Sequence, residues 1–120
     1  MKKDNVHEKA LEIAKLALSK KAQDIRILNV KKFTSVTDYF VICHGDVELQ
    51  VKAIHEAIND GMAKLGVKVW HREGYQFNRW VLLDYVDVVV LIFLKEMRDF
   101  YNIERLWGDA DVEIIEDGDK

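Results

Sequence analysis

The stretch TDYFVICHGD, residues 37 to 46, decides the fold of this chain. Its centre, 38–43, is apolar on both alternating faces. That pattern is typical of a strand covered on both sides, and therefore central in a sheet. The polar residues that follow end the strand, and Asp46 is placed to cap a helix. The helix is predicted over 47–65, because its apolar residues form a single stripe and Gly66 provides a stop.

The stretch WVLLDYVDVVVLIF, residues 80 to 93, predicts two further strands. They cover 80–85 and 88–94, and the acidic segment Asp84 to Asp87 turns between them or marks a bulge. This turn lacks the glycine that a tight turn prefers. The second strand is apolar on both faces, so we expect it to be another central strand of the sheet.

The remaining segments complete an α/β (α+β) pattern. They predict a helix over 5–20, a strand over 24–30, a half-covered strand over 67–73 and a helix from Lys95 to Trp107. The order α-β-β-α-β-β-β-α predicts a single domain with a mixed five-stranded sheet flanked by helices. We expect the domain to span 1–110 and an acidic C-terminal tail to span 111–120.

Composition limits the classes of function. The net charge of the 120 residues is −3, but the last twelve residues hold six acids and one lysine, which leaves 17 basic and 15 acidic groups in the body. A near-neutral body with an acidic tail is not typical of a nucleic-acid binder, whereas it is compatible with a basic protein partner. The single cysteine, Cys43, lies in an apolar run, where we expect a buried, inert thiol in a reducing cytoplasm. No apolar run reaches the roughly 18 residues of a membrane span.

Carboxylates are the first candidates for chemistry. Asp38, Asp46, Asp84 and Asp87 all lie at predicted strand ends or turns. Paired carboxylates at strand ends can hold Mg²⁺, so one hypothesis is a metal-dependent nucleotidyl- or phosphoryl-transfer enzyme that uses Asp38, Asp84 and Asp87. The alternative, which we favour, is that these aspartates cap a helix and satisfy turn amides.

No motif predicts a cofactor or a bound metal. The four histidines lack the spacing of a metal site, and Cys43 and His44 are neighbours that point to opposite faces of a strand. The chain has neither a P-loop nor a G-x-G-x-x-G fingerprint. We therefore expect no catalytic, cofactor-binding or metal-binding residue.

Aromatic residues are the remaining signal. Trp80 and Tyr85 bracket the acidic turn, where tryptophan and tyrosine are typical of interface anchors, although packing in the core explains them equally well. Phe100 and Trp107 are expected in the core.

Several motifs in one order resemble the Iojap family of ribosomal silencing factors. They are KKAQDIRILNV, TDYFVICHG, QVKAI, EG, WVLLDYVDVVVLIF and FYNIERLW, and the resemblance covers residues 9–110. It implies a fold with a nucleotidyltransferase-like outline but no enzymatic activity. It also implies a homodimer that binds large-subunit ribosomal protein fourteen on the large ribosomal subunit. The bound factor would block joining of the small subunit and repress translation when nutrients are short.

The resemblance also implies which residues bind the partner. Carried over to this chain, the partner surface centres on Trp80, Leu83, Asp84, Tyr85 and Asp87. Val86 stands where the family usually has glycine, and this departure alters the turn inside the implied binding segment.

Overall fold

The computed structural model describes residues 5–116, which form one mixed sheet packed between helices. In chain order the elements are α1 (Asn5–Leu18), β1 (Gln23–Asn29), β2 (Tyr39–Gly45), α2 (Glu48–Lys64), β3 (His71–Glu73), β4 (Trp80–Asp84), β5 (Val88–Leu94), α3 (Lys95–Tyr101), α4 (Ile103–Leu106) and β6 (Asp111–Ile115). The strands lie in the order β3-β4-β5-β2-β1-β6. The predicted α/β class and single domain are confirmed.

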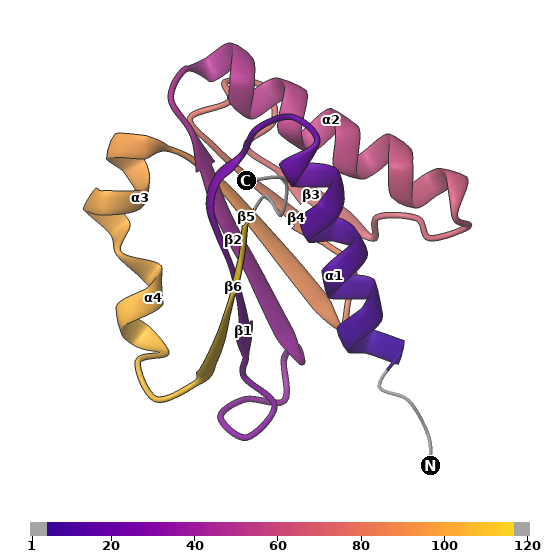
Figure 1. Cartoon of the computed structure of the whole chain (residues 1–120), viewed down its shortest axis with the longest axis vertical. Helices are drawn as coiled ribbons and strands as arrows, with labels where there is room; N and C mark the ends of the chain where they lie inside the picture. The colour runs from indigo at the N-terminus through magenta and orange to yellow at the C-terminus, as the bar shows by residue number, and fades with distance from the viewer. Residues whose placement is uncertain (1–4, 117–120) are drawn as a thin grey trace.

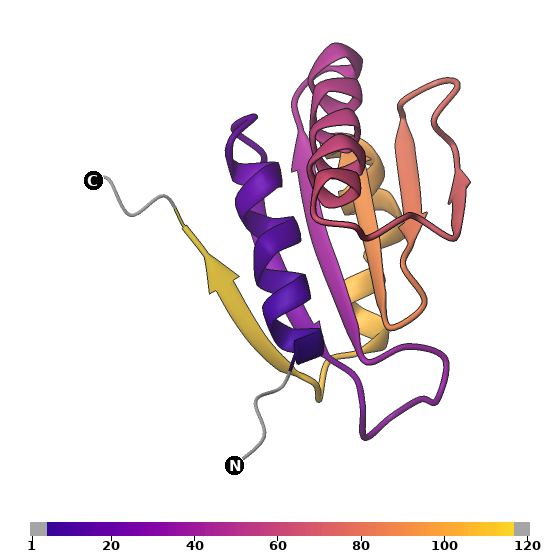
Figure 2. The same ribbon diagram turned by 90° about the vertical axis from the view of Figure 1, so that its right-hand side faces the viewer.

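The helices cover the two faces of the sheet unequally. Helices α1 and α2 lie on one face, and the shorter α3 and α4 lie on the other (Figure 1). Figure 2 shows the sheet from the side of α1 and α2, with α3 and α4 behind it. The larger hydrophobic cluster lies under α1 and α2, whereas a smaller cluster lies under α3 and α4.

The two strands that are apolar on both faces lie at the centre, as predicted. Strands β2 and β5 pair in parallel with a continuous register from Tyr39↔Val88 to Gly45↔Leu94. Cys43, in the middle of β2, is fully buried, and this burial raises the pKa of its thiol to about 12. A thiol in this state stays protonated and unreactive near neutral pH, as expected for an apolar site.

Helix α2 ends as predicted but begins differently. Gly66 adopts φ +82°, and the N–H groups of Gly66 and Val67 donate to the carbonyls of Ala63 and Met62, the paired hydrogen bonds of a Schellman motif. The prediction that Asp46 caps the helix was wrong. Val47 occupies the N-cap position without a side-chain hydrogen bond.

The C-terminal part of the chain departs from prediction in two places. The helix expected over 95–107 is split at Asn102, whose left-handed conformation (φ +48°) separates α3 from α4. The sheet has six strands rather than five, because Asp111–Ile115 pairs antiparallel with β1. Half of the predicted tail, Asp111–Ile115, therefore belongs to the sheet, and residues 117–120 lie outside the described part.

Two smaller expectations also need correction. The strand predicted over 67–73 is reduced to His71–Glu73 at the edge of the sheet. Phe100, expected in the core, is 77% exposed on α3, whereas Trp107 packs on the smaller cluster, with its ring centroid 5.5 Å from that of Phe40.

The sixth strand makes a prediction about truncation. Ending the chain after Ala110 removes β6 and uncovers the edge of β1, so thermal unfolding should show a loss of about 2 kcal/mol or more. Ending it after Ile115 keeps every β1–β6 pair and should leave the melting curve close to that of the full chain. Equal melting temperatures for the two truncated proteins would show that β6 contributes no stability.

Candidate partner-binding surface

The five residues implied as partner contacts are divided between the two faces of the sheet. Successive side chains of a strand point to opposite faces. Trp80 and Asp84 of β4 therefore share the face toward α3, and both are partly exposed. Leu83 points to the other face and is fully buried in the cluster under α1 and α2.

Tyr85 belongs to the core rather than to the surface. It is 3% exposed, and burial raises the pKa of its hydroxyl to about 12, opposed in part by the positive charge of Arg72. The Tyr85 hydroxyl has no hydrogen-bond partner among the described residues. Of the two aromatic residues that bracket the turn, only Trp80 is thus available at the surface in this conformation.

The turn between β4 and β5 is a γ-turn with an unusual central residue. The Asp87 N–H donates to the Tyr85 carbonyl at 3.0 Å, and Val86 between them adopts φ +78°. A positive φ is costly for a β-branched residue, and γ-turns of this hand are strained. The Asp84 carboxylate stabilises the turn, because its Oδ1 accepts from the Val86 N–H at 2.8 Å.

Helix α1 holds the turn from the other side. The Lys9 ammonium donates to Asp87 Oδ1 at 2.6 Å and to the Tyr85 carbonyl at 3.3 Å. The Asp87 carbonyl also accepts from the Asp38 N–H at 3.0 Å, which ties the turn to the start of β2. Asp87 therefore serves the fold, and its charge is already neutralised by Lys9.

Around Trp80 and Asp84 the sheet is left partly open. The cross-strand neighbours on this face are Trp80 beside Phe93, Leu82 beside Leu91 and Asp84 beside Val89. Leu82 and Leu91 are only partly buried, because α3 packs along β5 and β2 and does not cover the middle of β4. The open part of the sheet is thus an apolar strip with an aromatic ring at one end and a carboxylate at the other.

The charged side chains around this strip differ in whether they form ion pairs. His71 pairs with Glu73 at 2.7 Å on the neighbouring strand β3. No lysine, arginine or histidine of residues 5–116 forms an ion pair with Asp84. Asp84 is therefore a carboxylate on this face that a cation from outside could neutralise.

The candidate carboxylates are not gathered into one metal-binding group in the described part of the chain. Within residues 5–116 there is no group of three histidine, cysteine, aspartate or glutamate side chains that could hold a metal ion. Asp46 accepts from the Gln23 amide at 2.8 Å, and Asp84 and Asp87 are engaged in the turn.

Among the described helices, none has the length and apolar character needed to cross a bilayer.

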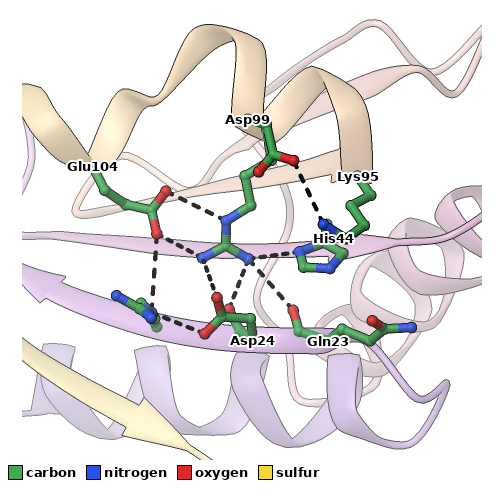
Figure 3. A network of polar contacts seen from close by, with 8 residues as sticks. Gln23, Asp24, His44, Lys95, Asp99 and Glu104 are labelled. Atoms are coloured by element: carbon green, nitrogen blue, oxygen red, sulfur yellow. Dashed lines mark hydrogen bonds and ion pairs between the residues drawn. The ribbon is translucent and has the colours of Figure 1, made fainter.

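A buried arginine that sequence reasoning missed fixes the helices beside the open strip. Arg98 of α3 is only 5% exposed, and its guanidinium donates to the carboxylate of Glu104 in α4 at 2.7 and 3.3 Å (Figure 3). It also donates to the Asp24 carbonyl at 2.8 Å and to His44 Nδ1 at 2.9 Å. One side chain thus links α3, α4, β1 and β2, because guanidinium presents five donors in a fixed plane.

The Arg98 contact requires a neutral imidazole at His44. Its Nδ1 accepts a hydrogen bond, so it cannot carry a proton in this arrangement. Burial, and next the charge of Arg98, hold the pKa of His44 below its ordinary value of 6.5. His44 therefore binds protons less readily in the folded chain than in the unfolded chain.

This difference predicts an acid-sensitive fold. Protonation favours the unfolded chain, so the free energy of unfolding should fall as the pH drops below about 6.5. Urea titrations at pH 7.5 and 5.5 measure this fall. In His44→Asn the amide oxygen can accept from Arg98 without titrating, so the fall should be smaller. It should not vanish, because burial also lowers the pKa of His55. An undiminished fall in His44→Asn would contradict this role.

The strained turn makes a second prediction. Val86→Gly should raise the free energy of unfolding by about 0.5–1 kcal/mol, since relief of the left-handed strain exceeds the entropic cost of glycine. Val86→Ala keeps a Cβ at the same φ and is the matched control, for which we expect no gain. Chemical denaturation compares the three proteins, and a glycine variant no more stable than the wild type would show that Val86 is not strained.

Comparison with known proteins places the chain in a family. A family model described as "Ribosomal silencing factor during starvation" matches residues 3–120. The ribosomal silencing factor RsfS of Bacillus subtilis is 46% identical over 101 residues, which cover 83% of this chain and 86% of that protein. The chloroplastic protein Iojap of Zea mays is 40% identical over 101 residues, covering 84% of this chain and 44% of that protein.

A solved structure shows the same fold. A crystal structure of a protein from Chromobacterium violaceum superposes with a TM-score of 0.84, at 31% sequence identity and 96% coverage of each chain. Sequence relatives and structural neighbour agree over nearly the whole chain, and we conclude that this protein belongs to the family of ribosomal silencing factors that includes Iojap.

Proposed function

We propose that the protein binds the large ribosomal subunit through large-subunit ribosomal protein fourteen and sterically prevents the small subunit from joining. Translation would thereby be repressed when nutrients are short. The observation that carries the proposal is family membership, joined to an open strip of sheet that ends in Trp80 and Asp84. We further propose that the protein is not an enzyme and acts in the cytoplasm as a homodimer.

The structure narrows the residues that could contact the partner. Trp80 and Asp84 lie on the open strip, so they are the contacts we retain from the implied set. Leu83 and Tyr85 are buried beneath the same strand, where they would support its position. Asp87, held by Lys9, would shape the turn at the end of the strip.

Charge complementarity supports a basic partner. Asp84 is acidic and has no ion-pair partner within the described residues, and the apolar side chains of Leu82 and Leu91 beside it are only partly buried. A carboxylate at the rim of an apolar patch favours a lysine or arginine on the partner, because attraction across an interface fixes orientation. Ribosomal proteins are commonly basic, as binding to RNA requires.

A steric mechanism needs no chemistry. A standard interface covers about 800 Å² on each partner, roughly a tenth of the 7399 Å² surface of this chain. The molecule measures 42 × 34 × 33 Å, so most of it would project from its footprint. Bound where the two subunits meet, a body of this size would separate surfaces that must otherwise touch.

The proposal predicts the behaviour of two substitutions at Asp84. Asp84→Asn keeps the oxygen that accepts from the Val86 N–H but removes the charge, so the fold should persist while binding weakens. Asp84→Lys places a positive charge against a basic surface and should weaken binding by at least ~2 kcal/mol, roughly 30-fold. Co-sedimentation with purified large subunits measures both losses.

Melting curves of the same proteins separate binding from folding. The interpretation requires that the wild type bind large subunits most tightly, Asp84→Asn less tightly and Asp84→Lys least tightly. The asparagine variant should also be as stable as the wild type. If a folded Asp84→Lys protein holds the large subunit as tightly as the wild type does, the open strip is not the interface.

A further inference from the structure

The loop over 74–79, between β3 and β4, exposes a large aromatic side chain. Phe77 at its tip is 76% exposed. Exposed phenylalanines on mobile loops are common, but this loop is fixed at several points. An apolar group that is both exposed and rigid loses little entropy when it binds, which is what an interface anchor requires.

The first contact that fixes the loop is a hydrogen bond from a buried histidine. His55 of α2 is 5% exposed, and its Nε2 donates to the Asn78 side-chain carbonyl at 2.9 Å. Asn78 adopts φ +60°, and its N–H donates to the Gly74 carbonyl at 3.2 Å. The residue after Phe77 is therefore held both to α2 and to the start of its own loop.

The second contact that fixes the loop is the close approach of Gly74 to Trp80. Gly74 adopts φ +80°, and a Cβ on it would lie 2.2 Å from the Trp80 carbonyl oxygen and about 3 Å from the indole ring. Only glycine allows this contact. At the end of the loop the Arg79 carbonyl accepts from the Leu94 N–H at 2.8 Å, which fixes the loop to the end of β5.

Phe77 and Trp80 line a pocket of apolar character. It has a volume of about 220 Å³ and is completed by Gly74, Arg79, Met97 and Tyr101. The Arg79 guanidinium lies 3.8 Å from Glu48, so its charge is compensated. An apolar side chain suits this mostly apolar lining better than a charged one, since a charge buried there would lose its hydration.

From these observations we infer that Phe77 and its pocket form a second part of the partner surface, which takes an apolar side chain of the ribosomal protein. The inference rests on the proposed function, because Trp80 both lines the pocket and lies on the same face as Asp84. His55 is assigned as the positioning residue that holds Phe77 through Asn78. Trp80 and Asp84 are four residues apart on one strand, or about 13 Å. The partner should therefore present an apolar side chain about that far from its basic group.

Phe77→Ala tests the anchor. Phe77 is mostly exposed, so the variant should melt like the wild type while binding to purified large subunits falls about tenfold. Phe33→Ala is the matched control, because Phe33 is 50% exposed and lies in the connection between β1 and β2, at the other end of the central strands. We expect the control to bind normally.

A double-mutant cycle tests the role of His55. His55→Leu removes the donor to Asn78, whereas His55→Gln can restore it. If His55 acts by positioning Phe77, His55→Leu should weaken binding in the wild type but add little in the Phe77→Ala background, and His55→Gln should retain binding. A general loss of structure would weaken both backgrounds equally, and that outcome would overturn the positioning role.

The same titration separates the inference from the proposed function. Failure of the wild type to bind large subunits would contradict the proposed function itself. Wild-type binding that is unchanged by Phe77→Ala would leave that function standing and overturn the inference about the pocket.

Discussion

The parallel pairing of β2 with β5 is the constraint on which the rest of the structure depends. Both strands are apolar on both faces, so neither can be stable unless helices cover the sheet on two sides. The chain meets this need by placing α1 and α2 on one side and α3 and α4 on the other. Two strands in parallel require a long crossover, and α2 with the β3–β4 hairpin is that connection.

The unequal cover creates the proposed surface. Helices α3 and α4 contain far fewer residues than α1 and α2, and Arg98 fixes them over β1, β2 and the end of β5. The middle of β4 is left with partly exposed apolar residues that a longer helix would have buried. A contiguous exposed apolar strip is typical of a protein-binding site. Fold and proposed function thus follow from the same asymmetry.

Local strain and local ties are concentrated around this strip. The Val86 turn closes one end, where Lys9 and Asp84 hold it, and the loop over 74–79 closes the other end. Two of these contacts, from Lys9 of α1 and His55 of α2, come from the far side of the sheet. The well-packed face therefore serves as the support that keeps the open face rigid.

Much of this arrangement could be predicted from the sequence. The bounds of β5 match the prediction because seven consecutive apolar residues admit few alternatives. Alternation along β4 could also have placed Tyr85 on the buried face with Leu83, although the resemblance to the silencing factors implied that Tyr85 contacts the partner.

Other features had no clear signal in the sequence. The acidic residues of β6 obscure the alternation of apolar and polar residues that would identify a strand. Charged residues are common in edge strands. The break at Asn102 depends on one residue in a left-handed conformation. Arginines on helices are mostly exposed, so the burial of Arg98 depends on acceptors from β1, β2 and α4 that only the folded chain brings together.

The central claim is that this protein keeps the two ribosomal subunits apart. The most direct test is to add the purified protein to separated subunits, under conditions that otherwise favour joining, and to resolve the mixture on a sucrose gradient. The account predicts that the peak of joined ribosomes falls as protein is added and that the protein sediments with the large subunit. An unchanged peak of joined ribosomes at saturating protein would contradict it.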